Sequence, residues 1–122
     1  MIQPGRLPLV GNRYTPFVYS IDVVGVDLTG ATILAQIRIS PDAAGEPIAS
    51  FATGLSVTTT NGIPTSTIDL TLTEASMTAM PEAAEIGNAV ALAWDIVVTT
   101  ADTTKFVLVG GSFTINPGVA HG

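Results

Sequence analysis

The chain has 122 residues, which is enough for one domain with its own hydrophobic core. It contains no cysteine, and its one histidine, His121, is the last residue but one. Disulfides, zinc sites and histidine-based catalytic triads therefore lack the side chains they need. The net charge of −6 argues against a nucleic-acid partner, and no apolar run is long enough to span a membrane. We expect no enzyme activity, no cofactor, no bound metal and no small-molecule substrate.

Charge is scarce in this sequence. Charged residues make up 11% of the chain and hydrophobic residues 47%, whereas a soluble domain typically has about 25% charged residues. Two interpretations remain open. Either the surface is rich in uncharged Thr and Ser, or much of it is covered by other subunits in an assembly.

Residues 1–14 are expected to form an extended arm, because their prolines and glycines disfavour regular structure. The arm holds two arginines and no acid, and the rest of the chain has a balance of 2 − 10 = −8. One interpretation is an arm that lies on the acidic body of a neighbouring copy, so that its deletion leaves a folded monomer that does not assemble. The other is a disordered terminus. The candidate assembly contacts are Ile2, Arg6, Leu7, Leu9, Val10 and Arg13.

Alternating apolar residues predict the strands of the first half. Phe17 and Tyr19 begin a row that is expected to face the core. The pair Asn61 and Gly62 predicts a tight hairpin, because both residues tolerate a positive φ. We expect strands from residue 15 onward and at 31–40, 48–53, 55–60 and 66–73, with a turn at 41–47.

The second half begins with a short helix at 73–80, which Thr73 caps and Pro81 ends, and in which Met77 and Met80 share a face. Strands are then expected at 88–100 and 105–116, joined by a hairpin loop at 101–104. The apolar residues of the last strand change parity at Gly110-Gly111, which predicts a β-bulge there. The expected core residues are Ile33, Ile37, Leu70, Leu92, Trp94, Ile96, Phe106 and Phe113.

About seven strands with little helix predict an all-β fold, namely an immunoglobulin-like antiparallel sandwich over residues 15–119. The extended arm precedes this domain, and residues 120–122 form a short tail.

Carboxylates are the remaining candidates for chemistry. Asp42 and Glu46 flank a turn, and calcium accepts such oxygens, but Asp is also an ordinary turn residue. Asp69 and Asp95 are expected on outward strand positions. They form either a two-carboxylate glycosidase site, if their strands pair, or a solvated strand face. We favour the structural interpretation for both pairs.

Three segments in order resemble a module of bacteriophage tail, baseplate and fibre-attachment proteins, with the N-terminal domain of phage upper baseplate proteins as the nearest relative. They are residues 26–38, VDLTGATILAQIR; residues 94–99, WDIVVT, followed by the loop ADTTK at 101–105; and residues 110–119, GGSFTINPGV. The resemblance covers about residues 15–119. In the family the loop is often a shorter Asp-Gly hairpin, and the chain usually continues into further domains.

The resemblance implies a virion structural protein that binds other virion proteins and copies of itself in the tail, baseplate, neck or fibre-anchoring region. One alternative is a capsid decoration protein on the head. A second is a carbohydrate- or receptor-binding β-sandwich, which would need an exposed aromatic shelf or a calcium-held loop.

Overall fold

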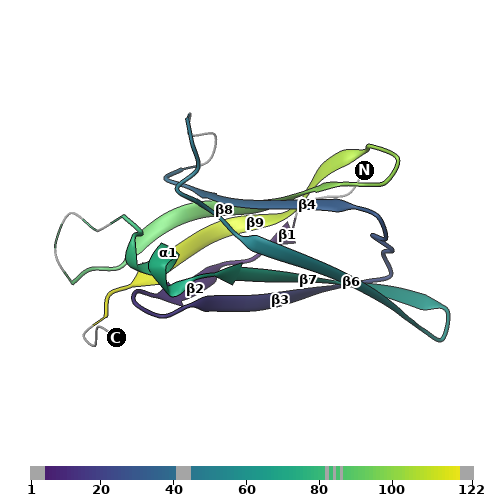
Figure 1. Cartoon of the computed structure of the whole chain (residues 1–122), viewed down its shortest axis with the longest axis horizontal. Coiled ribbons are helices and arrows are strands. Elements are labelled where there is room, and N and C mark those ends of the chain that lie inside the picture. The colour runs from purple at the N-terminus through teal and green to yellow at the C-terminus, as the bar shows by residue number, and fades with distance from the viewer. Residues whose placement is uncertain (1–4, 41–44, 82, 84, 86, 119–122) are drawn as a thin grey trace.

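The computed structural model describes residues 5–40, 45–81, 83, 85 and 87–118. The elements are β1 (Gly5–Arg6), β2 (Leu9–Asn12), β3 (Phe17–Val24), β4 (Thr32–Arg38), β5 (Ala49–Ser50), β6 (Ala52–Thr60), β7 (Ile63–Leu72), α1 (Glu74–Thr78), β8 (Val90–Thr99) and β9 (Lys105–Asn116). The strands form two sheets that face each other with the core between them, so the expected all-β sandwich is confirmed (Figure 1).

The strand order is that of an immunoglobulin-like sandwich. One sheet runs β1-β9-β8-β4-β5, with β2 also paired to β9, and the other runs β3-β7-β6. Pairs within these sheets are antiparallel except those of β1 and β2 with β9, which are parallel. When β3 to β9 are lettered B, C, C′, D, E, F and G, the two orders read G-F-C-C′ and B-E-D, which is the strand order of the immunoglobulin fold.

The chain passes from one sheet to the other at Phe51. This residue lies between β5 and β6 and is 6% exposed. Its ring lies 5.9 Å from the ring of Phe17, 6.1 Å from that of Trp94 and 5.8 Å from that of Phe113 (centroid distances). An aromatic cluster therefore joins the two layers at the crossing point.

The local turn and cap signals are borne out. Asn61 and Gly62 have φ values of 52° and 79°, and Thr60 pairs with Ile63 across the resulting two-residue hairpin. The Thr73 hydroxyl accepts a hydrogen bond from the Ser76 backbone N–H at 3.1 Å, as expected of a helix N-cap. Figure 1 shows α1 closing one end of the sandwich.

Most of the expected core residues are fully enclosed. Six of them are at most 4% exposed: Ile37, Leu70, Leu92, Trp94, Ile96 and Phe113. Ile33 and Phe106 are half-buried and pack against that core. Tyr19 differs, because it stays 39% exposed although it follows Phe17 on the inward face of β3. Since β3 is an edge strand, its ring reaches past the cover of the opposite sheet, stacked against the ring of Phe17.

The β-bulge of β9 lies at Leu108 and not at the glycine pair. Ile96 stands opposite Val109 and Val97 opposite Val107, which leaves Leu108 as the extra residue. The register runs without interruption through Gly110 and Gly111. The parity change was therefore predicted correctly but placed two residues too late, and the glycines have another role.

Candidate functional site: the N-terminal strands and their seat

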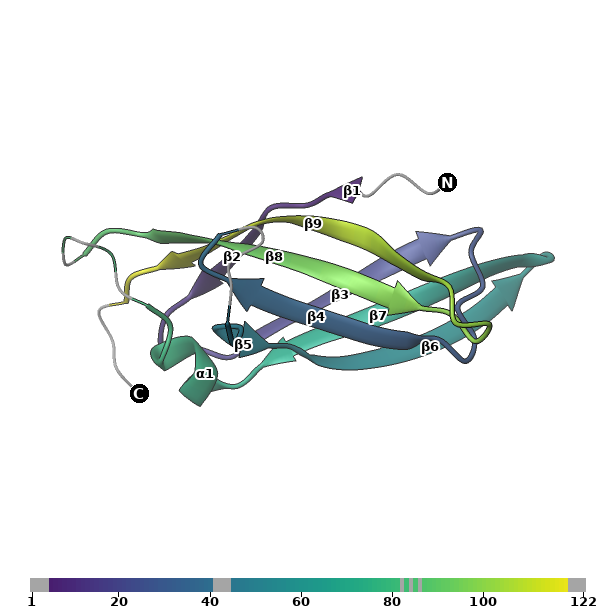
Figure 2. The same cartoon turned by 90° about the horizontal axis from the view of Figure 1, so that it is seen from above.

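The N-terminal segment lies on the sheet of its own chain. Gly5 and Arg6 pair with Val109 and Gly110 of β9, and Leu9–Asn12 pair with residues 113–116. Between them, the Leu7 backbone N–H donates to the Gly110 carbonyl at 3.0 Å. Figure 2 shows β1 beside β9, with β2 continuing beneath β9 in this view. The expected arm is thus an edge strand in two pieces, and in this structure its contacts are intramolecular.

Gly111 of β9 provides the room for this segment. A Cβ atom on Gly111 would lie 2.7 Å from the Leu7 carbonyl oxygen, closer than such atoms approach each other. That same oxygen accepts a hydrogen bond from the indole N–H of Trp94 at 3.0 Å. Gly11 of β2 has a similar role, because a Cβ there would lie 2.6 Å from the Met77 methyl carbon. Close approach of the Leu7 backbone explains Gly111, and close approach of the Met77 and Phe113 side chains explains Gly11.

Arg13 holds the end of the segment against the helix. Its side chain is 8% exposed and donates to the carbonyls of Thr78 at 3.2 Å, Met80 at 2.7 Å and Pro81 at 2.8 Å. These carbonyls lie at and just after the C-terminal end of α1, where helix carbonyls lack helical partners. We expected Arg13 to pair with acids of a neighbour, whereas the structure buries it in this chain.

The candidate assembly contacts are divided between the interior and the surface. Leu9 is 3% exposed, Leu7 packs against the core, and Arg13 is buried. Arg6 and Val10 are exposed, Val10 by 58%. Ile2 lies outside the described residues. Alternation along β2 therefore assigns one face to the sandwich and the other to solvent.

A hollow of about 530 Å³ opens on the outer face of the six-stranded sheet, beside β1. Small residues, Ala93, Gly110 and Gly111, line it together with polar ones, Arg6, Gln36, Arg38 and Asp95. The Arg38 guanidinium donates to the Gly45 carbonyl at 2.6 Å and to the Gln36 side-chain oxygen at 3.3 Å. The hollow therefore has lining residues of both charges, and β1 contributes Gly5 and Arg6 to its wall.

Asp69 and Asp95 do not come together. Asp95 is on β8 of the six-stranded sheet, whereas Asp69 is on β7 of the other sheet, and both are exposed. Asp69 accepts a hydrogen bond from the Ser20 hydroxyl at 2.6 Å. Because the two carboxylates face away from each other across the sandwich, the glycosidase alternative has no geometric basis. Asp42 lies outside the described residues.

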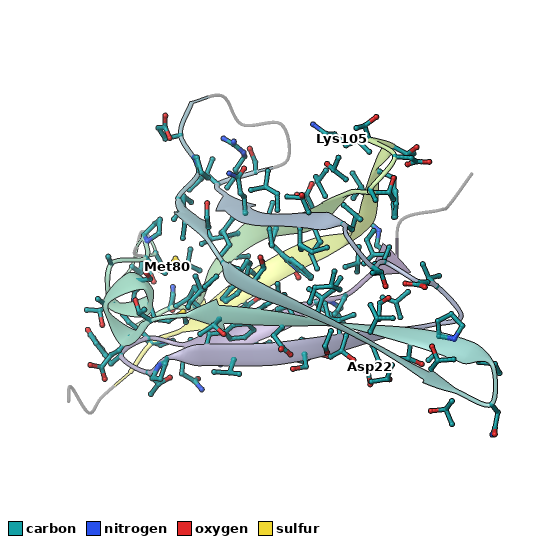
Figure 3. All side chains as sticks on the ribbon, turned by 45° about the vertical axis from the view of Figure 1, so that its right-hand side comes forward. Asp22, Met80 and Lys105 are labelled. Atoms are coloured by element: carbon teal, nitrogen blue, oxygen red, sulfur yellow. The ribbon has the colours of Figure 1, made fainter. Side chains whose placement is uncertain are left out.

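The outer face of the three-stranded sheet carries small polar residues and two acids. Asp22 accepts from the Thr67 hydroxyl at 2.8 Å, in the same way that Asp69 accepts from Ser20. Figure 3 shows Asp22 on this sheet and Lys105 on the hairpin that joins β8 to β9, well apart from each other. This face is therefore acidic and mostly built from Thr and Ser.

Residues 26–30 form a tight turn that packs on the sandwich through Leu28. The Asp27 carboxylate accepts from the side chain and the backbone N–H of Thr29, and these two bonds hold the pKa of Asp27 below its usual range. Leu28 is 3% exposed and inserts into the core. Ser66, which is fully buried, accepts from the Leu28 N–H at 2.9 Å and donates to the Val26 carbonyl at 2.7 Å.

Sequence reasoning missed Ser66, although a signal for it existed. It occupies an inward position of β7, in step with Ile68 and Leu70, where an apolar residue is the norm. A lone serine in such a row indicates a buried backbone group that needs a partner. Its partner was the turn 38 residues earlier, which only the fold brings close.

Large apolar side chains remain exposed on both sheets. They are Val10, Val18, Tyr19, Val24, Leu34, Ile39 and Ile63, with exposed fractions from 39% to 70%. Among the described strands, β3 and β6 pair only with β7, so each leaves one edge open. The β6 edge runs for nine residues without a charge or a proline.

Within the described residues, no group of three or more His, Cys, Asp or Glu side chains is placed to hold a metal ion. No helix in the described part of the chain is long and apolar enough to cross a membrane. The sequence matches no protein-family model, and no curated protein matches it.

Proposed function

We propose that this chain is a structural protein of a bacteriophage virion and that it acts by binding other protein subunits in the tail, baseplate, neck or fibre-anchoring region. Its role is mechanical and not catalytic. The sandwich supplies a rigid body, and its open edges and exposed apolar residues supply the contacts.

One observation carries the proposal: the chain exposes apolar side chains and unprotected strand edges while it has few charges. Soluble monomers usually protect an open edge with Lys, Pro, a bulge or a short strand. The β6 edge has none of these over its nine residues, and its register with β7 is continuous. Such an edge fits a strand of another subunit, because the added strand satisfies its free backbone groups.

The position in the virion is proposed from the resemblance of three segments, residues 26–38, 94–99 with 101–105, and 110–119, to phage tail and baseplate modules. In this chain the first segment builds the turn around Leu28 and continues into β4, and the other two begin on β8 and β9. The segments that carry the resemblance therefore belong to the framework of the sandwich, which proteins with different neighbours can share.

Immunogold labelling of purified phage particles from cells that carry the gene tests this proposal. We expect antibodies against the chain to label the tail, baseplate or neck, and we expect no label on particles from which the gene has been deleted. Label over the head would assign the chain to capsid decoration. A chain that stays wholly in the particle-free fraction would overturn the virion role.

A further inference from the structure

We infer that residues 5–13 form an exchangeable strand segment, which binds the body of a second copy of this chain with the same contacts that it makes in its own. The inference deepens the proposed assembly function, on which its biological use rests, by naming the partner. It also gives an intermolecular role to the N-terminal arm, which in this structure pairs with the sheet of its own chain.

The seat of the segment is made entirely by the body of the molecule. Gly111 gives the backbone room, and the Gly110 carbonyl accepts from the Leu7 N–H. Trp94 donates to the Leu7 carbonyl, and the carbonyls after α1 receive Arg13. Leu9 fills the remaining apolar site. Because every copy offers the same seat, the arm of a second copy fits it by construction, and the exchanged dimer keeps the contacts between segment and body while the hinge contacts change.

The connection between the segment and the body is short and strained. Only residues 13–16 separate β2 from β3, and Tyr14 has a φ of 75°, a left-handed conformation that favours glycine. Its ring packs closely on Gly118, where a Cβ would lie 2.7 Å from Tyr14 Cδ2. Thr15 closes the turn by donating its N–H to the Asn12 carbonyl at 3.3 Å. A short strained hinge favours exchange, because an extended hinge releases the strain while the arm stays bound.

Protein concentration decides between the closed form, in which the segment binds its own chain, and the exchanged form, in which it binds a second copy. A segment tethered by a short linker has an effective concentration in about the millimolar range for its own seat. The arm of a second copy therefore competes with the tethered arm only where copies are crowded, as they are in an assembling particle. Relief of two strained hinges in each dimer shifts the balance further toward exchange.

Engineered cysteines distinguish the two forms, and the chain has no native cysteine to interfere. Val10 of β2 and Thr114 of β9 are direct partners in the parallel ladder. In the Val10→Cys/Thr114→Cys variant, oxidation links one chain internally in the closed form but links two chains in the exchanged form. We expect covalent dimers on a non-reducing gel that increase with protein concentration up to about 1 mM. The single Val10→Cys variant controls for random surface disulfides.

A hinge variant gives an independent measurement by sedimentation velocity. Glycine adopts the left-handed conformation without cost, so Tyr14→Gly removes the strain and is expected to weaken dimerisation by roughly 30-fold. Tyr14→Phe keeps both the ring and the strain, and we expect it to dimerise like the natural chain. Unchanged fluorescence of Trp94, the only tryptophan, verifies that the segment stays seated in each variant.

A chain that remains monomeric over this concentration range overturns the inference. So does a dimer in which the double-cysteine variant closes only internal disulfides, because that dimer uses another surface. These outcomes are separate from those of the proposed function. A monomeric chain found in particles keeps the virion role and removes exchange, whereas an exchanged dimer absent from particles does the reverse.

Discussion

Arg13 and Arg6 belong to the same N-terminal segment, but their surroundings differ. Arg13 is 8% exposed and binds three carbonyls, whereas Arg6 is exposed at the rim of the hollow. We expect Arg13→Met to lower the free energy of unfolding by about 2–4 kcal/mol, because buried carbonyls lose charged donors. The matched Arg6→Met change should stay within about 0.5 kcal/mol. Urea denaturation of both variants checks this, and equal losses would contradict the assigned role of Arg13.

Ser66 is a second residue whose importance comes from a distant turn. Ser66→Ala leaves the Leu28 N–H and the Val26 carbonyl without their partner. We expect a loss of about 1–3 kcal/mol in the free energy of unfolding. Ser56→Ala, on the exposed face of β6, serves as the control and should change it by less than about 0.5 kcal/mol. A neutral Ser66→Ala would mean that other groups satisfy the turn.

Asp102 links stability to pH. The Thr100 hydroxyl, followed by the Thr104 backbone N–H, donates to its carboxylate and holds its pKa below the usual range. A pKa lowered by folding stabilises the protein above the unfolded value of about 3.9, and the effect is lost as the pH falls through the folded pKa. The Tm difference between the natural chain and Asp102→Asn should therefore be largest above about pH 5 and shrink below about pH 4. A difference independent of pH would contradict this.

At the scale of elements, β6 is the strand whose edge is least protected. Lysines at Ser56 and Thr58 would place charge on that edge and oppose the addition of a strand. We expect the Ser56→Lys/Thr58→Lys variant to enter virions about tenfold less than the natural chain, as counted by quantitative mass spectrometry of purified particles. Thr65→Lys/Thr71→Lys adds the same charge on the central strand β7.

The Thr65→Lys/Thr71→Lys variant is the control and should enter virions like the natural chain. Both variants should have a Tm close to that of the natural chain. If the edge variant is incorporated as well as the control, β6 does not contact a neighbour. The exposed apolar residues of other elements, such as Val18 and Val24 on β3, would then become the stronger candidates.

The strands and turns themselves were largely predictable, because alternation and turn chemistry are local. The Asn61-Gly62 hairpin, the Thr73 cap and the row around Trp94 follow from residues close in sequence. The exact position of the bulge did not follow, since a parity change marks a segment and not one residue. The glycine pair favoured that interpretation, although Gly111 serves the close approach of the Leu7 backbone.

At the scale of the whole molecule, the N-terminal segment is part of the fold. Deletion of residues 1–13 removes Leu9 and Arg13 and uncovers the Trp94 indole. In place of a folded monomer that fails to assemble, we now expect a chain destabilised by about 4 kcal/mol or more, with red-shifted Trp94 fluorescence. Thermal melts and emission spectra check this, with Val10→Thr as a control on the exposed face of β2.

A synthetic peptide of residues 1–13 should restore part of the lost Tm, since the seat belongs to the body. A truncated chain as stable as the complete one would contradict the assigned role of the segment. Peptide rescue would show that the seat accepts a segment that is not covalently attached, as strand exchange requires.

The amino-acid sequence alone determined the fold class, the approximate strands and most of the core, because period-two alternation and turn residues act over a few neighbours. Tertiary structure alone decided where the N-terminal segment lies, what Arg13 and Ser66 bind, and why β9 needs Gly111. The reason is distance along the chain: Arg13 binds carbonyls 65 to 68 residues away, and Trp94 binds a carbonyl 87 residues away. Such pairings depend on which strand edges meet, and that is settled only when the two sheets have packed.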